Sequence, residues 1–124
     1  MDERPLGVFD SGLGGLSGFR HLAQLMPNED ILYLGDTGRV PYGTRSRETI
    51  IRYACEDAEF LVGRGVKAIL VACGTVSSNC LAEVGAESGL PVVGVINAAA
   101  KKAADLWNIG KVMRGGVGDR KSVV

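Results

Sequence analysis

The stretch AILVACGTVSSN (residues 68–79) joins a continuous apolar run to a cysteine, a glycine and a cluster of hydroxyl side chains. A continuous apolar run is typical of a central parallel strand that is covered on both faces. The polar residues after it lead into a helical segment, so Cys73 falls between a strand and a helix. Open α/β proteins place their ligand sites at such strand ends. We therefore expect Cys73 to lie at the functional edge of a sheet.

Short apolar runs alternate with segments of helical period on both sides of this stretch. Strands are expected at 6–9, 31–34, 68–72 and 92–96, and helices at 16–26, at 46–65, through Leu81 and Val84 after the hydroxyl-rich residues 75–79, and at 97–107. This alternation predicts βαβ units with right-handed crossovers. The expected fold class is α/β, with a doubly wound parallel sheet between helices in one domain.

The composition narrows the classes of partner and the compartment. The 14 acidic residues balance the 14 basic ones, which favours neither nucleic acid nor an acidic membrane surface as a partner. No window approaches the ~18 apolar residues of a membrane span, and the amino terminus lacks the long apolar region of a secretory signal. Three cysteines without disulfide-scaffold spacing fit a reducing compartment. We expect a cytoplasmic protein without membrane or nucleic-acid partners.

Polar residues follow three of the expected strands. Asp10 and Ser11 come after the first strand, residues 36–43 after the second and residues 73–78 after the third. The carboxyl ends of parallel strands meet at one edge, where ligands bind. These segments are therefore expected to form one site.

The three cysteines are interpreted differently because of their positions. Cys73 faces a helix start, whose partial positive charge favours the reactive thiolate. Cys55 and Cys80 fall on or near helices and are interpreted as buried core residues. His21 on the first helix is interpreted as a surface or packing residue, and no His and Cys spacing indicates a zinc site.

Two short motifs invite other interpretations. The glycines of GLGGLSG (12–18) follow a strand, but their spacing departs from the dinucleotide fingerprint and better fits a tight turn, whose NH groups can hold a carboxylate. FDSG (9–12) and GDTG (35–38) repeat the D-[ST]-G signature of aspartic proteases. Those enzymes use all-β lobes, whereas the flanks here alternate strand and helix.

Four segments together resemble the cofactor-independent amino-acid racemases of the aspartate/glutamate racemase family. They are GVFDSGLGGLS (7–17), YLGDTGRVPYGTRS (33–46), VACGTVSSN (71–79) and PVVGVI (91–96). The resemblance implies two doubly wound domains that face each other over a small buried site, with one thiol from each domain. One thiolate removes the α-proton and the opposite thiol returns a proton to the other face, without pyridoxal phosphate or a metal.

The resemblance also implies roles for individual residues. Cys73 matches the amino-terminal thiol, and Asp10 matches the carboxylate that orients the substrate ammonium or assists proton transfer. The positions expected to contact the substrate, through hydroxyls or backbone NH groups, are Asp10, Ser11, Tyr42, Gly43, Gly74 and Thr75. Gly74 stands where the family often has asparagine, so only backbone contacts remain at that position.

The resemblance implies glutamate as the substrate, a role in supplying D-glutamate for peptidoglycan, and a homodimer when the protein is full length. We expect residues 1–112 to form an incomplete amino-terminal racemase-like domain, and residues 113–124 to be an artefactual tail foreign to the family. Neither Cys55 nor Cys80 matches the cysteine of the second domain. The alternatives are an aspartate racemase or related racemase-fold enzyme, and an inactive fragment or ligand-binding module.

Overall fold

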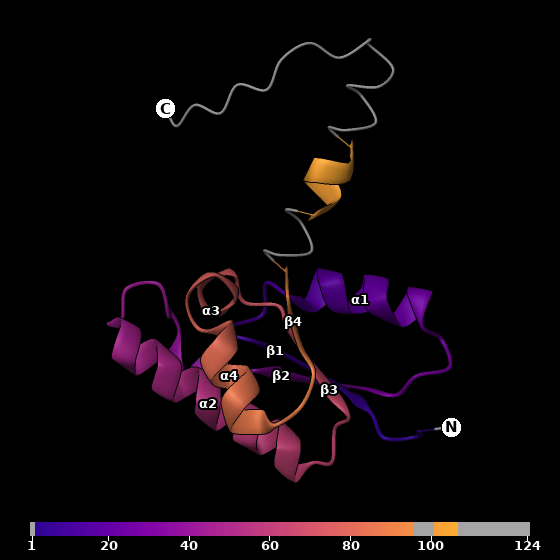
Figure 1. The fold of residues 1–124 in the computed structure, drawn as a ribbon, viewed down its shortest axis with the longest axis horizontal. Helices are drawn as coiled ribbons and strands as arrows, with labels where there is room; N and C mark the ends of the chain where they lie inside the picture. The colour runs from indigo at the N-terminus through magenta and orange to yellow at the C-terminus, as the bar shows by residue number, and fades with distance from the viewer. Residues whose placement is uncertain (1, 96–100, 107–124) are drawn as a thin grey trace.

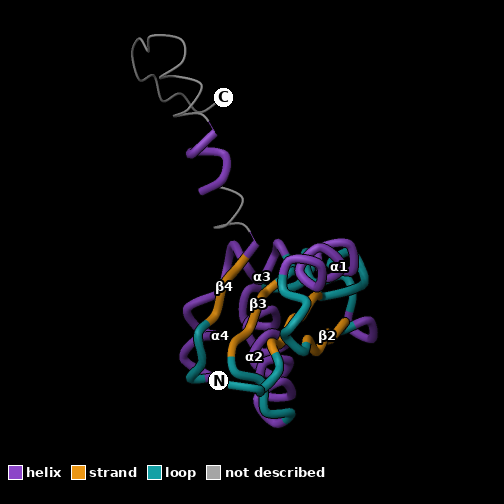
Figure 2. The backbone as a smooth tube through the Cα atoms, turned by 90° about the vertical axis from the view of Figure 1, so that its right-hand side faces the viewer, coloured by secondary structure: helices purple, strands orange, loops and turns teal. Residues whose placement is uncertain are grey.

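The computed structural model describes residues 2–95 and 101–106, which contain a parallel sheet between helices (Figure 1). The strands are β1 (Leu6–Asp10), β2 (Ile31–Gly35), β3 (Ala68–Val71) and β4 (Val92–Gly94), in the spatial order β2-β1-β3-β4 (Figure 2). The helices are α1 (Leu16–Leu25), the 3-10 turn η1 (Thr37–Arg39), α2 (Arg47–Gly63), α3 (Gly74–Asn79) and α4 (Leu81–Ser88). The predicted α/β fold class is confirmed.

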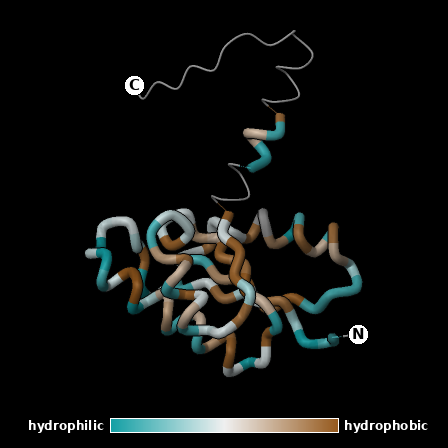
Figure 3. Tube along the Cα trace, viewed as in Figure 1, coloured by the Kyte–Doolittle hydropathy of each residue, from teal (hydrophilic) through white to brown (hydrophobic). Residues whose placement is uncertain are grey.

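The two faces of the sheet carry different helices. Helix α1 lies on one face, whereas α2 and α4 lie on the other (Figure 1). Phe9 of β1 and Val71 of β3 point toward α2 and are fully buried. Alternate residues of the same strands, Val8 and Leu70, point toward α1. In Figure 3 the central strands are mostly brown, which agrees with apolar residues on both faces of each strand.

The predicted elements agree with the structure apart from their ends and one additional helix. Ser46 caps α2 as expected, since its hydroxyl accepts a hydrogen bond from the Thr49 N–H. The short helix expected through Leu81 and Val84 is confirmed as α4. Residues Gly74–Asn79 before it form the separate helix α3, because Cys80 has non-helical angles (φ −148°, ψ 31°). Of the helix expected at 97–107, residues 101–106 are helical and the others lie outside the described residues, as does the predicted tail at 113–124.

Strand register brings three chain segments to one edge. Asp10 at the end of β1 pairs with Gly35 of β2. The Asp36 N–H donates to the Asp10 carbonyl at 2.9 Å, and the Ala72 N–H donates to the Phe9 carbonyl at 2.8 Å. The loops that begin at Ser11, Asp36 and Ala72 are therefore neighbours, as the strand-end argument predicted.

Candidate functional site

Asp10 provides the buried carboxylate of this edge, and the loop after β1 holds it in place. Its side chain is nearly inaccessible. Oδ1 accepts the Ser11 N–H at 2.8 Å, and Oδ2 accepts the Gly15 N–H at 2.6 Å. The Tyr33 hydroxyl lies 3.4 Å from Oδ2. Burial, followed by the charge of Asp10, raises the pKa of Tyr33, so this hydroxyl stays protonated. Backbone donors thus fix the carboxylate and leave some of its lone pairs for a ligand.

Gly15, in the glycine-rich turn, allows the start of α1 to lie close to this carboxylate. A Cβ atom on Gly15 would lie 2.9 Å from both Asp10 Oδ2 and the Ala72 Cβ. A side chain at this position therefore cannot fit without movement of the strand end. The Gly15 amide binds the carboxylate of Asp10 in the same chain. This contact accounts for a glycine at position 15, and no bound dinucleotide is needed to explain it.

Cys73 lies between β3 and α3, next to the end of β1. It is the residue before the first turn of α3, and its carbonyl accepts the Ser77 N–H at 2.9 Å. The residue is 3% exposed and belongs to the core cluster that includes Tyr42 and Val76. The thiol is therefore largely shielded from water, on an element whose position is set by the sheet.

The loop after β2 and the start of α3 meet at Gly43 and Thr75. A Cβ atom on Gly43 would lie 3.8 Å from Thr75 Oγ1, so the Thr75 hydroxyl is close to the Gly43 backbone. Gly43 and Gly74 are exposed, and Ser11 and Thr75 are half-buried. A hydroxyl and backbone amides thus lie at a surface that a small anion can reach.

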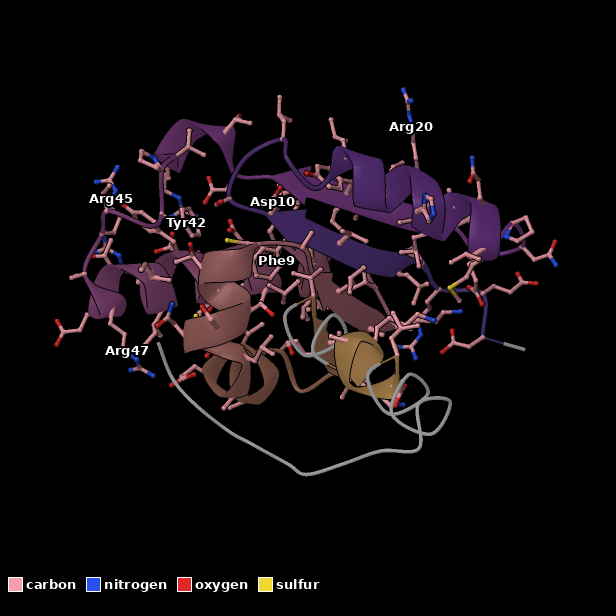
Figure 4. The ribbon with its side chains drawn as sticks, turned by 90° about the horizontal axis from the view of Figure 1, so that it is seen from above. Phe9, Asp10, Arg20, Tyr42, Arg45 and Arg47 are labelled. Carbon is pink, nitrogen blue, oxygen red and sulfur yellow. The ribbon has the colours of Figure 1, made fainter. Side chains whose placement is uncertain are left out.

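Tyr42, next to Gly43 in the chain, directs its hydroxyl away from that surface. It is 1% exposed, and its hydroxyl binds the carboxylates of Asp36 and Asp57. Burial, followed by these two hydrogen bonds, raises the pKa of Tyr42. Figure 4 shows Tyr42 turned inward, while Arg45 and Arg47 extend outward at the same end of the molecule. Any contact of Tyr42 with a ligand at the edge therefore involves its backbone.

Sequence reasoning missed two charged partners of this loop. Arg39 Nε binds Asp36 Oδ2 at 2.7 Å, and one of its terminal nitrogens lies 3.1 Å from Asp57 Oδ1. Asp57 is 4% exposed on the buried face of α2, together with Ile50, Ala54, Ala58 and Leu61. An aspartate inside an apolar helical stripe was the available signal, because a buried acid needs partners.

Of the other two cysteines, Cys80 is a buried core residue as expected, whereas Cys55 is only half-buried. Cys55 is on α2, and its thiol lies 3.9 Å from the Glu83 carbonyl. Cys80 is 1% exposed. Burial, followed by the charge of Glu83, raises the pKa of Cys80 to about 11. Burial likewise raises the pKa of Cys55, with Glu87 contributing next. Both thiols are therefore poor candidates for a thiolate.

A hollow lies beside this edge, between α1 and the sheet. It has a volume of about 470 Å³, and its walls are mainly apolar, with Val8, Phe19, Leu22 and Leu70 among them. Neither Asp10 nor Cys73 lines it. The hollow is therefore separate from the candidate catalytic residues.

The described part of the chain contains no group of three or more His, Cys, Asp and Glu side chains placed to hold a metal ion. Within the same residues, no helix combines the length and the apolar character that crossing a membrane requires.

Comparison with known proteins relates most of the chain to one group of enzymes. It is 46% identical over 112 residues to the glutamate racemase of Geobacter metallireducens, covering 90% of this chain and 42% of that protein. The glutamate racemase of Thermus thermophilus is 46% identical over 110 residues, with coverage of 89% and 43%. A scan against protein-family models finds no match.

Solved structures give the same relationship. The glutamate racemase of Aquifex pyrophilus superposes with a TM-score of 0.78 at 48% identity, covering 80% of this chain and 39% of that chain. The Francisella tularensis glutamate racemase in complex with D-glutamate gives a TM-score of 0.75 at 48% identity, with coverage of 79% and 38%.

The parallel sheet of this chain superposes on part of solved glutamate racemase structures. Over the aligned part, the chain is similar to glutamate racemases in both sequence and fold. The chain spans about two fifths of the length of the curated relatives it matches.

Proposed function

We propose that this domain binds glutamate at the carboxyl edge of its sheet and supplies one of the two acid/base groups of a glutamate racemase. The observation that carries the proposal is that Asp10, Cys73 and the Gly43–Thr75 contact converge there from three separate connections. Similarity to a racemase that binds D-glutamate supports this choice of substrate.

Cys73 is the acid/base. As a thiolate it removes the α-proton, and the electron pair of the broken C–H bond passes to the carbanion conjugated with the α-carboxylate. A proton donated to the opposite face forms the new C–H bond and inverts the centre, after which Cys73 carries the proton it removed. Its burial favours this step, because a shielded site limits competing protonation by water.

The surrounding residues hold the substrate. The Gly43 amide and the Thr75 hydroxyl bind a carboxylate, with Ser11 and the Gly74 backbone contributing nearby. Asp10 accepts the substrate ammonium or assists proton transfer, which its fixed and buried carboxylate favours. Tyr42 contributes its backbone, since its hydroxyl is bound to carboxylates.

The second acid/base lies in a domain outside this chain. In the whole protein we place the reaction in the cytoplasm, where it supplies D-glutamate for peptidoglycan, and we expect a homodimer. Contacts to the opposite face of the substrate would then come from that other domain.

The experiment follows deuterium incorporation at the α-carbon of L- and D-glutamate in D2O, catalysed by the intact protein that contains this domain. Cys73→Ser should reduce exchange of at least one enantiomer to background, whereas Cys55→Ser, which changes a thiol away from the edge, should retain it. Full turnover by Cys73→Ser would exclude Cys73 as the base.

Two alternatives give different results in the same assay. Faster exchange with aspartate than with glutamate would indicate an aspartate racemase or related racemase-fold enzyme. If the 124-residue chain shows glutamate-dependent NMR shifts at Gly43 and Thr75, but the intact protein exchanges no α-proton, the domain is a ligand-binding module.

A further inference from the structure

Three oxygen atoms with too few hydrogens meet beneath the Tyr42–Gly43 segment. The Tyr42 hydroxyl lies 2.6 Å from Asp57 Oδ2 and also contacts Asp36 Oδ2. Tyr42 and Asp57 are 1% and 4% exposed, so bulk water does not separate the groups. The contacts therefore need hydrogens that the residues themselves carry.

A count of hydrogens requires one more proton in this cluster. A tyrosine hydroxyl donates a single hydrogen, and ionised carboxylates donate none. Tyr42 can thus satisfy Asp36 or Asp57, but not both. The second short contact becomes favourable when one carboxyl group carries a proton and donates it, either to the tyrosine oxygen or to the other carboxylate.

Arg39 does not remove this requirement. It binds Asp36 and Asp57, but it also binds Glu56 on α2, so one guanidinium faces three carboxylates. Its own hydrogens point to Asp36 Oδ2 and to Asp57 Oδ1. The contact of Tyr42 with two carboxylates remains one hydrogen short.

We propose that Asp36 and Asp57 share one proton, and that this carboxyl pair positions the Tyr42–Gly43 segment for binding the substrate carboxylate. Asp57 is a positioning residue, since it acts on the edge through Tyr42 and from a different element, α2. The functional consequence rests on the role of Gly43 in the proposed function. The shared proton itself does not depend on the proposed function.

The charges around Asp57 agree with a retained proton. The pKa of Asp57 is raised to about 7, because burial and the nearby Asp36 carboxylate raise it by more than the Tyr42 hydrogen bond and Arg39 lower it. These three groups face Asp57 from the connection between β2 and α2. On α2 itself, Glu56 competes for Arg39, whose guanidinium also lies 4.1 Å from the ring centre of Tyr53.

Loss of the shared proton should loosen the segment. Without that proton, Asp36 and Asp57 are both ionised and repel each other in a poorly hydrated site, and the single hydroxyl hydrogen of Tyr42 can neutralise neither charge. Relief comes from moving Tyr42, and Gly43 is the next residue in the chain. The amide predicted to bind the substrate carboxylate thus becomes less ordered as pH rises through the titration of the pair.

The test is a ¹³C NMR titration of the aspartate carboxyl carbons in the 124-residue chain. One carboxyl carbon of the Asp36/Asp57 pair should titrate between about pH 6 and 8, well above the ordinary aspartate value near 4. Asp36→Asn should lower the midpoint of Asp57 by about one pH unit or more, because it removes the neighbouring charge. Glu56→Gln is the matched control, since it removes a carboxylate bound to Arg39 but outside the tyrosine contact.

A second readout follows the hydrogen-exchange protection of the Gly43 amide across the same pH range. Protection in the wild type should fall through the titration of the pair, by about tenfold or less if local opening is responsible. Asp57→Asn imitates the protonated acid and should show a protection factor independent of pH.

The result that overturns the proposal is titration of both carboxyl carbons below about pH 5 in the wild type. Equal pH dependence of Gly43 protection in wild type and Asp57→Asn would overturn the positioning role. If Asp57→Asn does not fold, the wild-type and Asp36→Asn titrations still decide the question. Failure to bind or racemise glutamate would count against the proposed function and leave these titrations unchanged.

Discussion

Gly15→Ala is the substitution for which the structure gives the clearest expected magnitude. The added methyl group would lie 2.9 Å from the Ala72 Cβ and from Asp10 Oδ2, and 3.3 Å from the Tyr33 hydroxyl oxygen. The Ala72 Cβ cannot rotate away, because it is attached directly to the backbone at the end of β3. Overpacking of this kind costs about 1–3 kcal/mol. A weakened bond from the Gly15 N–H to the ionised Asp10 adds to that loss.

Urea unfolding followed by circular dichroism measures this loss directly. In a separate thermal melt, a loss of about 1–3 kcal/mol should lower the melting temperature by about 4–12 °C for a domain of this size. Gly14→Ala is the matched control, since its methyl group would lie 3.9 Å from Asp10 Oδ2, an ordinary contact. The reasoning is refuted if Gly15→Ala is as stable as Gly14→Ala.

Three further substitutions follow from the same structure. Gly94→Ala should destabilise the domain by about 1–3 kcal/mol in urea titration, because its methyl group would overlap the Ser77 hydroxyl and approach Leu81 Cδ1 to 2.6 Å. Gly85→Ala within α4 meets nothing within 4 Å and should raise the free energy of unfolding by about 0.5–1 kcal/mol. The folded-state pKa of Asp57 lies above its unfolded value, so its favourable contribution is complete at low pH and is lost as pH rises toward about 7. Wild-type stability relative to Asp57→Asn should therefore fall between about pH 4 and 7, and a constant difference would contradict the raised pKa.

The fold was predictable because its signals are local and repeated. Apolar runs such as 68–71 and the helical stripe of α2 each indicate their own element, and parallel topology follows from their alternation. The helix over residues 74–79 was not predicted, and neither was the non-helical conformation of Cys80. Its backbone angles depend on how α3 and α4 pack, which no local pattern contains.

The position of the candidate site at the carboxyl ends of the strands was predictable from the sequence, but its side-chain contacts were not. Strand ends placed Asp10 and Cys73 side by side through register alone. The direction of the Tyr42 hydroxyl was not predictable, because it depends on Asp57, 15 residues further along and on another element. The contact between Gly15 and Asp10 was also not predictable. A glycine that forms a tight turn cannot be told by sequence from one that makes room for a nearby carboxylate.

Inversion at one carbon requires acid/base groups on opposite faces of the substrate, and the described residues offer one suitable thiol. Cys55 and Cys80 pack on the α2 and α4 side of the sheet, and burial raises the pKa of each. His21 lines the apolar hollow beside α1 rather than the edge. Under the proposed function, the second acid/base group therefore approaches from beyond the carboxyl ends of the strands.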